Sequence, residues 1–237
     1  MTLLPTATSE DEKRRAAPVA VLPVGSFEQH GPSLPLTTDT IVACAVAERV
    51  AAAYDLFLLP PVTISCSQEH NGWPGTVSMS HTTLTAVVTD IMASLRRSGP
   101  GRLAVISGHG GNYVLSNIVQ EANVDGPTMT LFPTRDDWAA ARAAAGLVSD
   151  AHDDMHAGEL EVSLLRHVCP ELVRPGVENT DHLAGDRKLL LVHGMAGYTA
   201  SGVIGQPSAG SAEKGRLILD SLVGSFKDHL DALTTDT

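Results

Sequence analysis

The chain has 237 residues, 43% of them hydrophobic, and a formal net charge of −11 from 16 basic and 27 acidic residues. Such a negative surface argues against nonspecific binding to nucleic acid or to anionic membranes, because both would repel it. No apolar run approaches the ~18 residues that a membrane-spanning helix needs, and the length suits a single α/β domain.

The cysteines and the first residues indicate where the protein works. The three cysteines (Cys44, Cys66 and Cys169) are far apart and form no CxxC pair, which favours reduced, buried thiols over disulfides or a thiolate zinc site. The start of the chain has no basic-then-apolar signal peptide. We therefore expect a cytoplasmic protein. Residues 1–17 contain a mixed-charge run and are predicted to form a flexible leader, and residues 18–237 a single domain.

Hydrophobic periodicity divides the rest of the chain into alternating strands and helices. In chain order we expect a strand at 18–25, a helix at about 40–53, a strand at 56–64, a helix at 82–97, a strand at 102–106, a helix ending near 124, a strand at 129–133, a helix at 159–168 and, after a loop at 200–210, a final amphipathic helix. This alternation predicts an α/β fold with a parallel sheet covered on both faces. In such folds the ligand site lies beyond the carboxyl ends of the strands.

The loop after the first strand contains Glu28, His30 and Asp39. Glu28 and His30 are two residues apart, so in an extended stretch their side chains leave the same side of the backbone. Histidine and carboxylate side chains are ligands suited to Zn, Mn or Fe. A helix cap at Asp39 and surface positions for the other two would account for the same residues without a metal.

The third strand runs into residues 107–112, where His109 stands between glycines. The glycines let the backbone turn sharply and leave His109 uncrowded at the end of the strand. A phosphate-binding loop is the main alternative, but the spacing is not GxGxxG and no P-loop lysine follows. We interpret His109 as a further metal ligand.

A carboxylate also stands at the head of the helix predicted near residues 157–168. Glu161, Leu164, Leu165 and Val168 share one apolar face, whereas Glu159 falls on the wetter face. A carboxylate on the apolar face must be paired, neutral or bound to a metal, because burying it bare is costly. The periodicity therefore predicts Glu161 rather than Glu159 as a ligand, with a buried salt bridge as the alternative.

Together these segments predict a hydrolytic centre with two divalent ions, which could be Zn, Fe or Mn. Its predicted ligands are the following: Glu28, His30, Asp39, His109 and Glu161. Asp39 could bridge the two ions, and a bridging water would be the nucleophile. His156, just before its helix, is the candidate catalytic residue, able to carry a proton or to bind the substrate.

Four ordered motifs resemble those of the creatininase (creatinine amidohydrolase) family. They are residues 22–32 with Asp39, 69–76, 107–112 and 156–163. The resemblance spans about residues 18–230 and implies a three-layer α/β/α sandwich with a mostly parallel sheet, two divalent metals, amide-bond hydrolysis and a homo-oligomer. It also implies that Glu28, Asp39 and His109 hold one ion. His30, Asp39 and a further carboxylate would hold the other.

The chain departs from creatinine hydrolases at Gly111. Those enzymes have a metal-binding glutamate two residues after the histidine that matches His109, so we expect Glu161 to supply the missing carboxylate. Ser33 also stands where many relatives have a second histidine, and creatinine is therefore not the expected substrate. Residues 153–165, 170–176 and 198–208 resemble the branch of this family associated with mycofactocin biosynthesis. That resemblance implies a peptide substrate from which a C-terminal Val-Tyr dipeptide is released.

Three other functions were weighed. A hydrolase of a small cyclic amide or formamide would use the same metal chemistry. A dehydrogenase or nucleotide-binding module would need GxGxxG after the first strand, which residues 25–30 do not contain, and the intact ligands oppose a scaffold without activity. Trp73, Met155, Tyr198 and the loop near Gly202 are candidates for lining the pocket, although plain packing or loop structure is the more usual reason for such residues.

Overall fold

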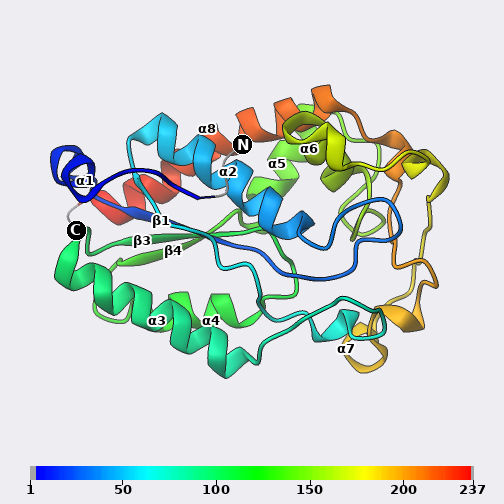
Figure 1. The fold of residues 1–237 in the computed structure, drawn as a ribbon, viewed down its shortest axis with the longest axis horizontal. Helices are drawn as coiled ribbons and strands as arrows, with labels where there is room; N and C mark the ends of the chain where they lie inside the picture. The colour runs from blue at the N-terminus through cyan, green and yellow to red at the C-terminus, as the bar shows by residue number, and fades with distance from the viewer. Residues whose placement is uncertain (1–3, 236–237) are drawn as a thin grey trace.

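Four short parallel strands form the centre of the computed structural model, which describes residues 4–235 (Figure 1). The strands are β1 (Ala20–Val24), β2 (Phe57–Leu58), β3 (Leu103–Ser107) and β4 (Met129–Phe132). Their order is β2-β1-β3-β4, with Ala20 paired to Leu103 and Leu103 paired to Met129. Every residue of β1 is buried, as expected for a central parallel strand whose two faces are both covered.

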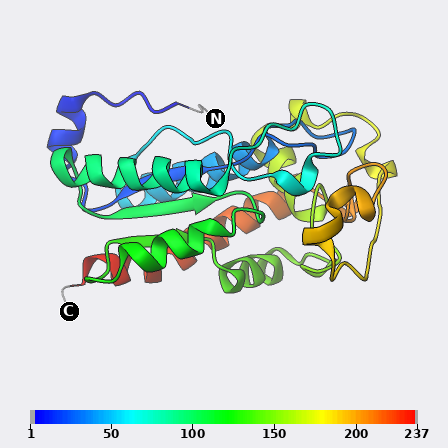
Figure 2. The same ribbon diagram turned by 90° about the horizontal axis from the view of Figure 1, so that it is seen from below.

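Most of the helices lie in two layers, one on each face of the sheet, whereas the first and the seventh lie outside these layers (Figures 1 and 2). Their bounds are α1 Ser9–Arg15, α2 Thr38–Tyr54, α3 His81–Ser98, α4 Val114–Ala122, α5 Arg135–Ala145, α6 Glu159–Val168, α7 Leu190–His193 and α8 Ala212–Thr234. Val21 of β1 packs in a core with α2, α5, α6 and α8, whereas Leu22 packs in a second core with α3 and α4. The predicted α/β/α sandwich is confirmed.

Short 3₁₀ turns of three residues each lie in the loops of the described chain. They are Gln68–His70, Pro170–Leu172, Val177–Asn179, Met195–Gly197 and Pro207–Ala209. None of the helices within residues 4–235 is both long enough and apolar enough to cross a membrane.

Two elements differ from the sequence prediction. The second strand is only two residues long instead of the predicted 56–64, because beyond β2 the chain pairs with β1 at a single bridge, Val24 to Val62. Helix α5 was not predicted, since most of its apolar positions are alanines, which give only a weak hydrophobic signal. Its capping box, in which Thr134 and Asp137 bond each other's backbone N–H, is the signal that identifies it.

The predicted leader contains helix α1. Thr8 and Asp11 form a capping box at its start, its side chains are mostly exposed, and the Arg15 guanidinium donates to the carboxylate of Asp55 at 3.0 Å. Sequence analysis assigned no helix here, and the flexibility of the leader stays a prediction.

Helix α8 packs against α2, α5 and α6 and holds them on the sheet. Phe226 lies in the core edge-to-face with Phe132 of β4, at 5.2 Å between ring centroids. At the start of α8 the ammonium of Lys214 lies 2.5 Å from the carboxylate of Glu159, the first residue of α6. That carboxylate is fully buried and also accepts hydrogen bonds from the backbone N–H and the hydroxyl of Ser149.

We expect the substitution Lys214→Met to lower the free energy of unfolding by about 3 kcal/mol, because it leaves the buried charge of Glu159 without its partner cation. Denaturant unfolding of the two proteins measures this difference. Lys227→Met is the matched control: Lys227 pairs with Asp231 on the same helix, but these side chains are 55% and 52% exposed. The control should lose less than about 1 kcal/mol. Equal losses in the two variants would contradict this account of the α6–α8 contact.

Candidate metal centre

The predicted ligands gather beyond the carboxyl ends of β1 and β3. Glu28 and His30 lie in the loop after β1, Asp39 in the first turn of α2, His109 after β3 and Glu161 in the first turn of α6. Four of these residues are buried, and the side chain of Glu161 is 16% exposed. The topology thus brings together residues that are up to 133 positions apart, counted from 28 to 161.

Two glycines let the backbone of α2 approach the strand ends closely. A Cβ atom on Gly25 would lie 2.4 Å from the Cα of Thr40, and one on Gly108 would lie 2.1 Å from the carbonyl oxygen of Asp39. From the sequence, the glycines near His109 are expected to permit a sharp turn. At Gly108 the reason is instead this contact, which sets Asp39 beside His109.

Asp39 is shared by two groups of candidate ligands. Its Oδ1 lies 3.1 Å from Nε2 of His30, and its Oδ2 lies 3.1 Å from Nδ1 of His109. One group is Glu28, Asp39 and His109, the other is His30, Asp39 and Glu161, and in each the ligand atoms lie within 4.8 Å of one another. These are the two sets expected from the sequence, with Glu161 as the further carboxylate.

The carboxylate of Glu28 is fully buried, and neither of its oxygens accepts a hydrogen bond from the described residues. Nε2 of His70 and Nδ1 of His109 each lie 3.2 Å from Oε1 of Glu28, without hydrogen-bond geometry. A buried carboxylate without partners is costly. A divalent cation would satisfy both of its oxygens, so the donor set fits a metal.

Three histidines have one ring nitrogen fixed by a backbone carbonyl. Nδ1 of His30 bonds the oxygen of Glu28 at 3.1 Å, Nε2 of His109 bonds that of Cys66 at 2.9 Å, and Nε2 of His156 bonds that of Gln29 at 2.7 Å. A carbonyl only accepts, so each of these nitrogens is the N–H of its ring. In the neutral ring the other nitrogen then presents its lone pair to the cluster, as metal-binding histidines do.

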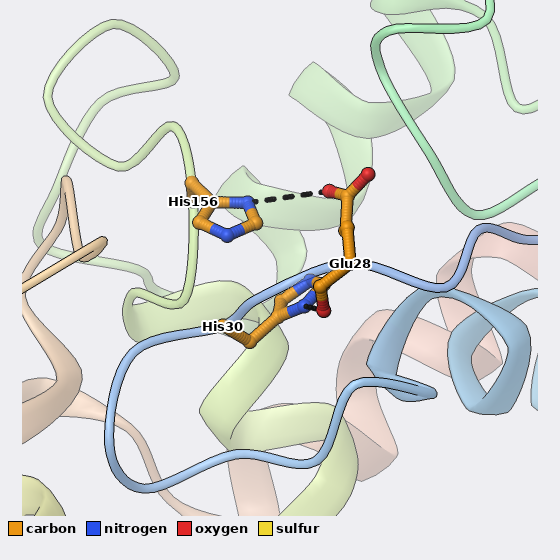
Figure 3. A group of neighbouring side chains, drawn as sticks. All are labelled: Glu28, His30 and His156. Atoms are coloured by element: carbon orange, nitrogen blue, oxygen red, sulfur yellow. Dashed lines mark hydrogen bonds and ion pairs between the residues drawn. The ribbon is translucent and has the colours of Figure 1, made fainter. Parts of the chain in front are cut away.

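His156 lies beside Glu28 and His30 of the cluster. In Figure 3 the carboxyl group of Glu28 points toward its Nδ1, at 3.8 Å. The ring also lies near that of His30, at 4.2 Å between centroids. Glu28, His30 and His156 are close enough to form a third group of candidate ligands.

His70 differs from these three histidines because it presents an N–H, and not a bare nitrogen, to Glu28. The side-chain amide of Gln29 donates to Nδ1 of His70 at 2.9 Å, and Gly31 N–H donates to the amide oxygen of Gln29 and so fixes the amide's orientation. Nε2 of His70 therefore carries the proton and faces Glu28 as a donor. Neither His70 nor Gln29 was among the predicted site residues, because their roles depend on a contact that sequence spacing does not show.

The pKa values reflect the concentration of negative charge. Burial opposes protonation of His30, but the carboxylates of Asp39, Glu161 and Glu28 outweigh it and raise its pKa to about 9. Burial likewise opposes protonation of His109, but Glu28 and Asp39 raise its pKa well above the ordinary value. Burial raises the pKa of Glu161 to about 7, although His30 opposes the shift. Without a bound cation, protons on His30, His109 and Glu161 therefore offset the negative charge of the carboxylates.

Glu159 is not on a wetter face, as the helical periodicity predicted. It is fully buried and bonds Ser149 and Lys214, whereas Glu161 is the more exposed of the two. The prediction was wrong because α8 covers the face that periodicity assigned to solvent. Glu161 nevertheless faces the cluster, with Oε1 3.9 Å from Nε2 of His30.

The space beside Gly111 is occupied by Glu69, another residue that the predicted site did not include. A Cβ atom on Gly111 would lie 1.9 Å from Oε1 of Glu69 and 2.4 Å from Nε2 of His109. The same carboxylate oxygen lies 3.4 Å from Nε2 of His109. Glu69 and a side chain at position 111 therefore compete for the same space.

A cavity of about 700 Å³ opens beside the cluster. His109, His156 and Glu161 line it at the cluster, and Arg135 and Trp138 of α5 line it further along. Among the other predicted pocket residues, Met155 lines this cavity and Trp73, Tyr198 and Gly202 do not. A volume of this order suits a ligand larger than a few atoms, since ligand pockets are typically ~300–1,000 Å³.

Comparisons with known proteins agree with this geometry. The family model described as creatinine amidohydrolase (Creatininase) matches residues 5–230. The mycofactocin precursor peptide peptidase of Mycolicibacterium smegmatis is 33% identical over 237 residues, which cover 96% of this chain and 90% of that protein. The creatinine amidohydrolase of Pseudomonas putida is 30% identical, over 90% of this chain and 88% of its own length. A solved structure described as "Creatininase Mn" superposes with a TM-score of 0.79 at 28% identity, over 94% of each chain.

Proposed function

The chain belongs to the creatininase family and is an amide-hydrolysing enzyme, and we propose that it is a peptidase that uses two divalent metal ions. The observation that carries the metal proposal is the buried carboxylate of Glu28, which has no hydrogen-bond partner and faces histidine nitrogens. The manganese named for the related creatininase structure gives independent support.

Glu28, Asp39 and His109 hold one ion in this proposal, and His30, Asp39 and Glu161 hold the other. Asp39 belongs to both sets and would be shared by the two ions, because its two oxygens face different histidines. The same set accepts Zn, Fe or Mn. Bound there, the ions would polarise the scissile carbonyl and lower the pKa of a water molecule.

His156 is the proposed proton carrier. Its Nε2–H is held by the carbonyl of Gln29, so its Nδ1 is free to accept a proton from the attacking water and to give it to the leaving amine. Burial and the nearby charges of His30 and His70 hold its pKa well below the ordinary value, which keeps the ring neutral. Hydrolysis then breaks the amide C–N bond, and water supplies the hydroxyl of the new acid and a proton of the new amine.

The proposed substrate is a mycofactocin precursor peptide, from which the enzyme releases the C-terminal Val-Tyr dipeptide. The relative from M. smegmatis that is named for this peptide aligns over nearly the whole chain. The cavity beside the cluster has room for a peptide segment, with Trp138 and Met155 as apolar wall. Position 111 is a glycine, whereas creatinine hydrolases have a metal-binding glutamate at the matching position. This difference favours a substrate other than creatinine.

We further propose a cytoplasmic homo-oligomer. The free, buried state of Cys44, Cys66 and Cys169 suits a reducing compartment. Leu191 and Val192 of α7 are exposed, and such an apolar patch suits contact with another subunit.

Elemental analysis of the purified protein and mass spectrometry of a precursor-peptide digest test the proposal together. We expect two ions per chain and release of the dipeptide. Glu161→Gln should lower the metal content toward one ion, whereas His156→Gln should keep both ions and lower kcat by roughly 10²–10⁴-fold.

Three results would argue against this assignment. Less than one tightly bound ion per chain contradicts the metal centre. Loss of metal in His156→Gln makes that residue a ligand instead of a proton carrier. Turnover of a small lactam or formamide without release of dipeptide contradicts the peptide substrate.

A further inference from the structure

Glu69 and Gly111 lie on the side of His109 that faces away from the proposed metals. His109 presents Nδ1 to Glu28 and Asp39, at 3.2 and 3.1 Å. Its Nε2 points the other way, to the carbonyl of Cys66 at 2.9 Å and to Oε1 of Glu69 at 3.4 Å. Glu69 belongs to none of the candidate ligand groups among the described residues. It is therefore placed to act on His109 and not on an ion.

The two residues also border a different cavity from the proposed substrate site. Glu69 and Gly111 line a second cavity of about 670 Å³, whereas His109, His156 and Glu161 line the first. A carboxylate on the far side of His109 does not reach a substrate in the first cavity. The contact of Glu69 with the proposed metal centre is the one that it makes with the imidazole ring of His109.

Two features hold the backbone of Glu69 in place: the turn in which it lies and the packing of Gly194 against its carbonyl oxygen. Glu69 and the neighbouring His70 form the single turn Gln68–His70, and His70 faces Glu28 from the same turn. Gly194, at φ +62°, packs against the carbonyl oxygen of Glu69: a Cβ there would lie 2.9 Å from it. The side chain then enters the space that Gly111 leaves open.

We propose that Glu69 is a positioning residue for His109 and that Gly111 is required to admit it. The proposal rests on the proposed metal centre. A carboxylate that accepts from the N–H of a metal-binding histidine fixes the orientation of the ring and makes its other nitrogen a stronger donor. In this protein the Nε2–H of His109 bonds the carbonyl of Cys66, and the carboxylate of Glu69 faces the same N–H at 3.4 Å as an ion-pair partner. Loss of such a partner typically weakens metal affinity by ~10–100-fold.

The test measures the affinity of the full-length protein for Mn²⁺ and Zn²⁺ by competition with a chelator, without any turnover. Glu69→Gln keeps the size of the side chain and removes its charge, and we expect one of the two ions to bind ~10–100-fold more weakly. Gly111→Ala places a methyl group 1.9 Å from Oε1 of Glu69 and 2.4 Å from Nε2 of His109, so it should displace the carboxylate and lower the affinity at least as much. The absorption spectrum of the Co²⁺-loaded protein should shift in both variants.

Coupling between the two positions separates this proposal from a general structural effect. Both substitutions remove the contact between Glu69 and His109. The double variant should therefore bind metal no more weakly than whichever single variant has the larger loss of affinity. Gly110→Ala is the control, since a Cβ there meets nothing within 4 Å, and it should bind metal as the unmodified protein does. Glu69→Asp should recover part of the affinity by restoring the charge.

The outcomes that overturn the proposal are distinct from failure of the metal centre itself. Unchanged affinity in Glu69→Gln removes the positioning role. Fully additive losses in the double variant show that Gly111 does not act through Glu69. If the unmodified protein binds neither ion, the proposed function fails along with this inference, and that result is seen before any variant is compared.

Discussion

Substitution of Asp39 by alanine is expected to abolish binding of both metal ions and to lower kcat/KM by at least ~10³-fold, or about 4 kcal/mol. Asp39 is shared by both groups of ligands, with Oδ1 toward His30 and Oδ2 toward His109. Every other proposed ligand serves a single ion in the assignment made here. Removal of Asp39 should therefore have a larger effect than removal of Glu161.

Elemental analysis and steady-state kinetics measure this effect, and circular dichroism shows whether the variant folds. Asp39→Asn is the companion variant: it keeps the size of the side chain and a partner for the Ser26 hydroxyl, which bonds Asp39 at 2.6 Å. Asp90→Ala, at an exposed position on α3, is the control and should change neither quantity. Full activity, or two bound ions, in Asp39→Ala would refute the bridging role.

The substitution Gly108→Ala should separate α2 from the end of β3. Its Cβ would lie 2.1 Å from the carbonyl oxygen of Asp39 and 2.9 Å from the backbone N of Ala43. Backbone atoms at the start of a buried helix cannot rotate away as a side chain does, so the helix must move. We expect the free energy of unfolding to fall by about 3 kcal/mol, and metal binding to be lost because Asp39 moves away from His109.

Denaturant unfolding and metal titration of this variant provide the measurement. Gly110→Ala is the matched control in the same loop, because a Cβ at that position has open space around it. Neither glycine has a positive φ, so the comparison isolates crowding from backbone strain. If Gly108→Ala were as stable as Gly110→Ala and bound both ions, the close approach of α2 would not be what sets the site.

The strands and candidate ligands that could be predicted are those that short stretches of sequence identify, either by an apolar run or by polar residues directly after it. An unbroken apolar stretch at β1 predicts a strand buried on both faces, and the structure shows both faces covered. Glu28, His30, Asp39 and His109 could be proposed because a parallel sheet places the ends of its strands along one edge. The structure brings these side chains together, whereas their metal binding stays a prediction.

The features that could not be predicted depend on partners distant in sequence. Glu159 was assigned to solvent because its partner Lys214 is 55 residues further along the chain. The role of His70 depends on an amide proton from Gln29, 41 residues earlier. Glu69 was missed because its place beside the open position at Gly111 exists only after folding. Periodicity describes a helix by itself and contains no information about what later covers it.

The packing of α8 also has a consequence for the order of events during synthesis. Helix α8 follows every proposed ligand in the chain, yet it holds α6, and with it His156 and Glu161, against the sheet. When Glu28, His30, Asp39 and His109 have emerged from the ribosome, α8 has not yet been made. Without α8 nothing holds α6, and so Glu161 of the second group of ligands, in its place. Since domains fold as units, loading of both metals should follow the emergence of α8 and should not begin while α8 is still inside the ribosome.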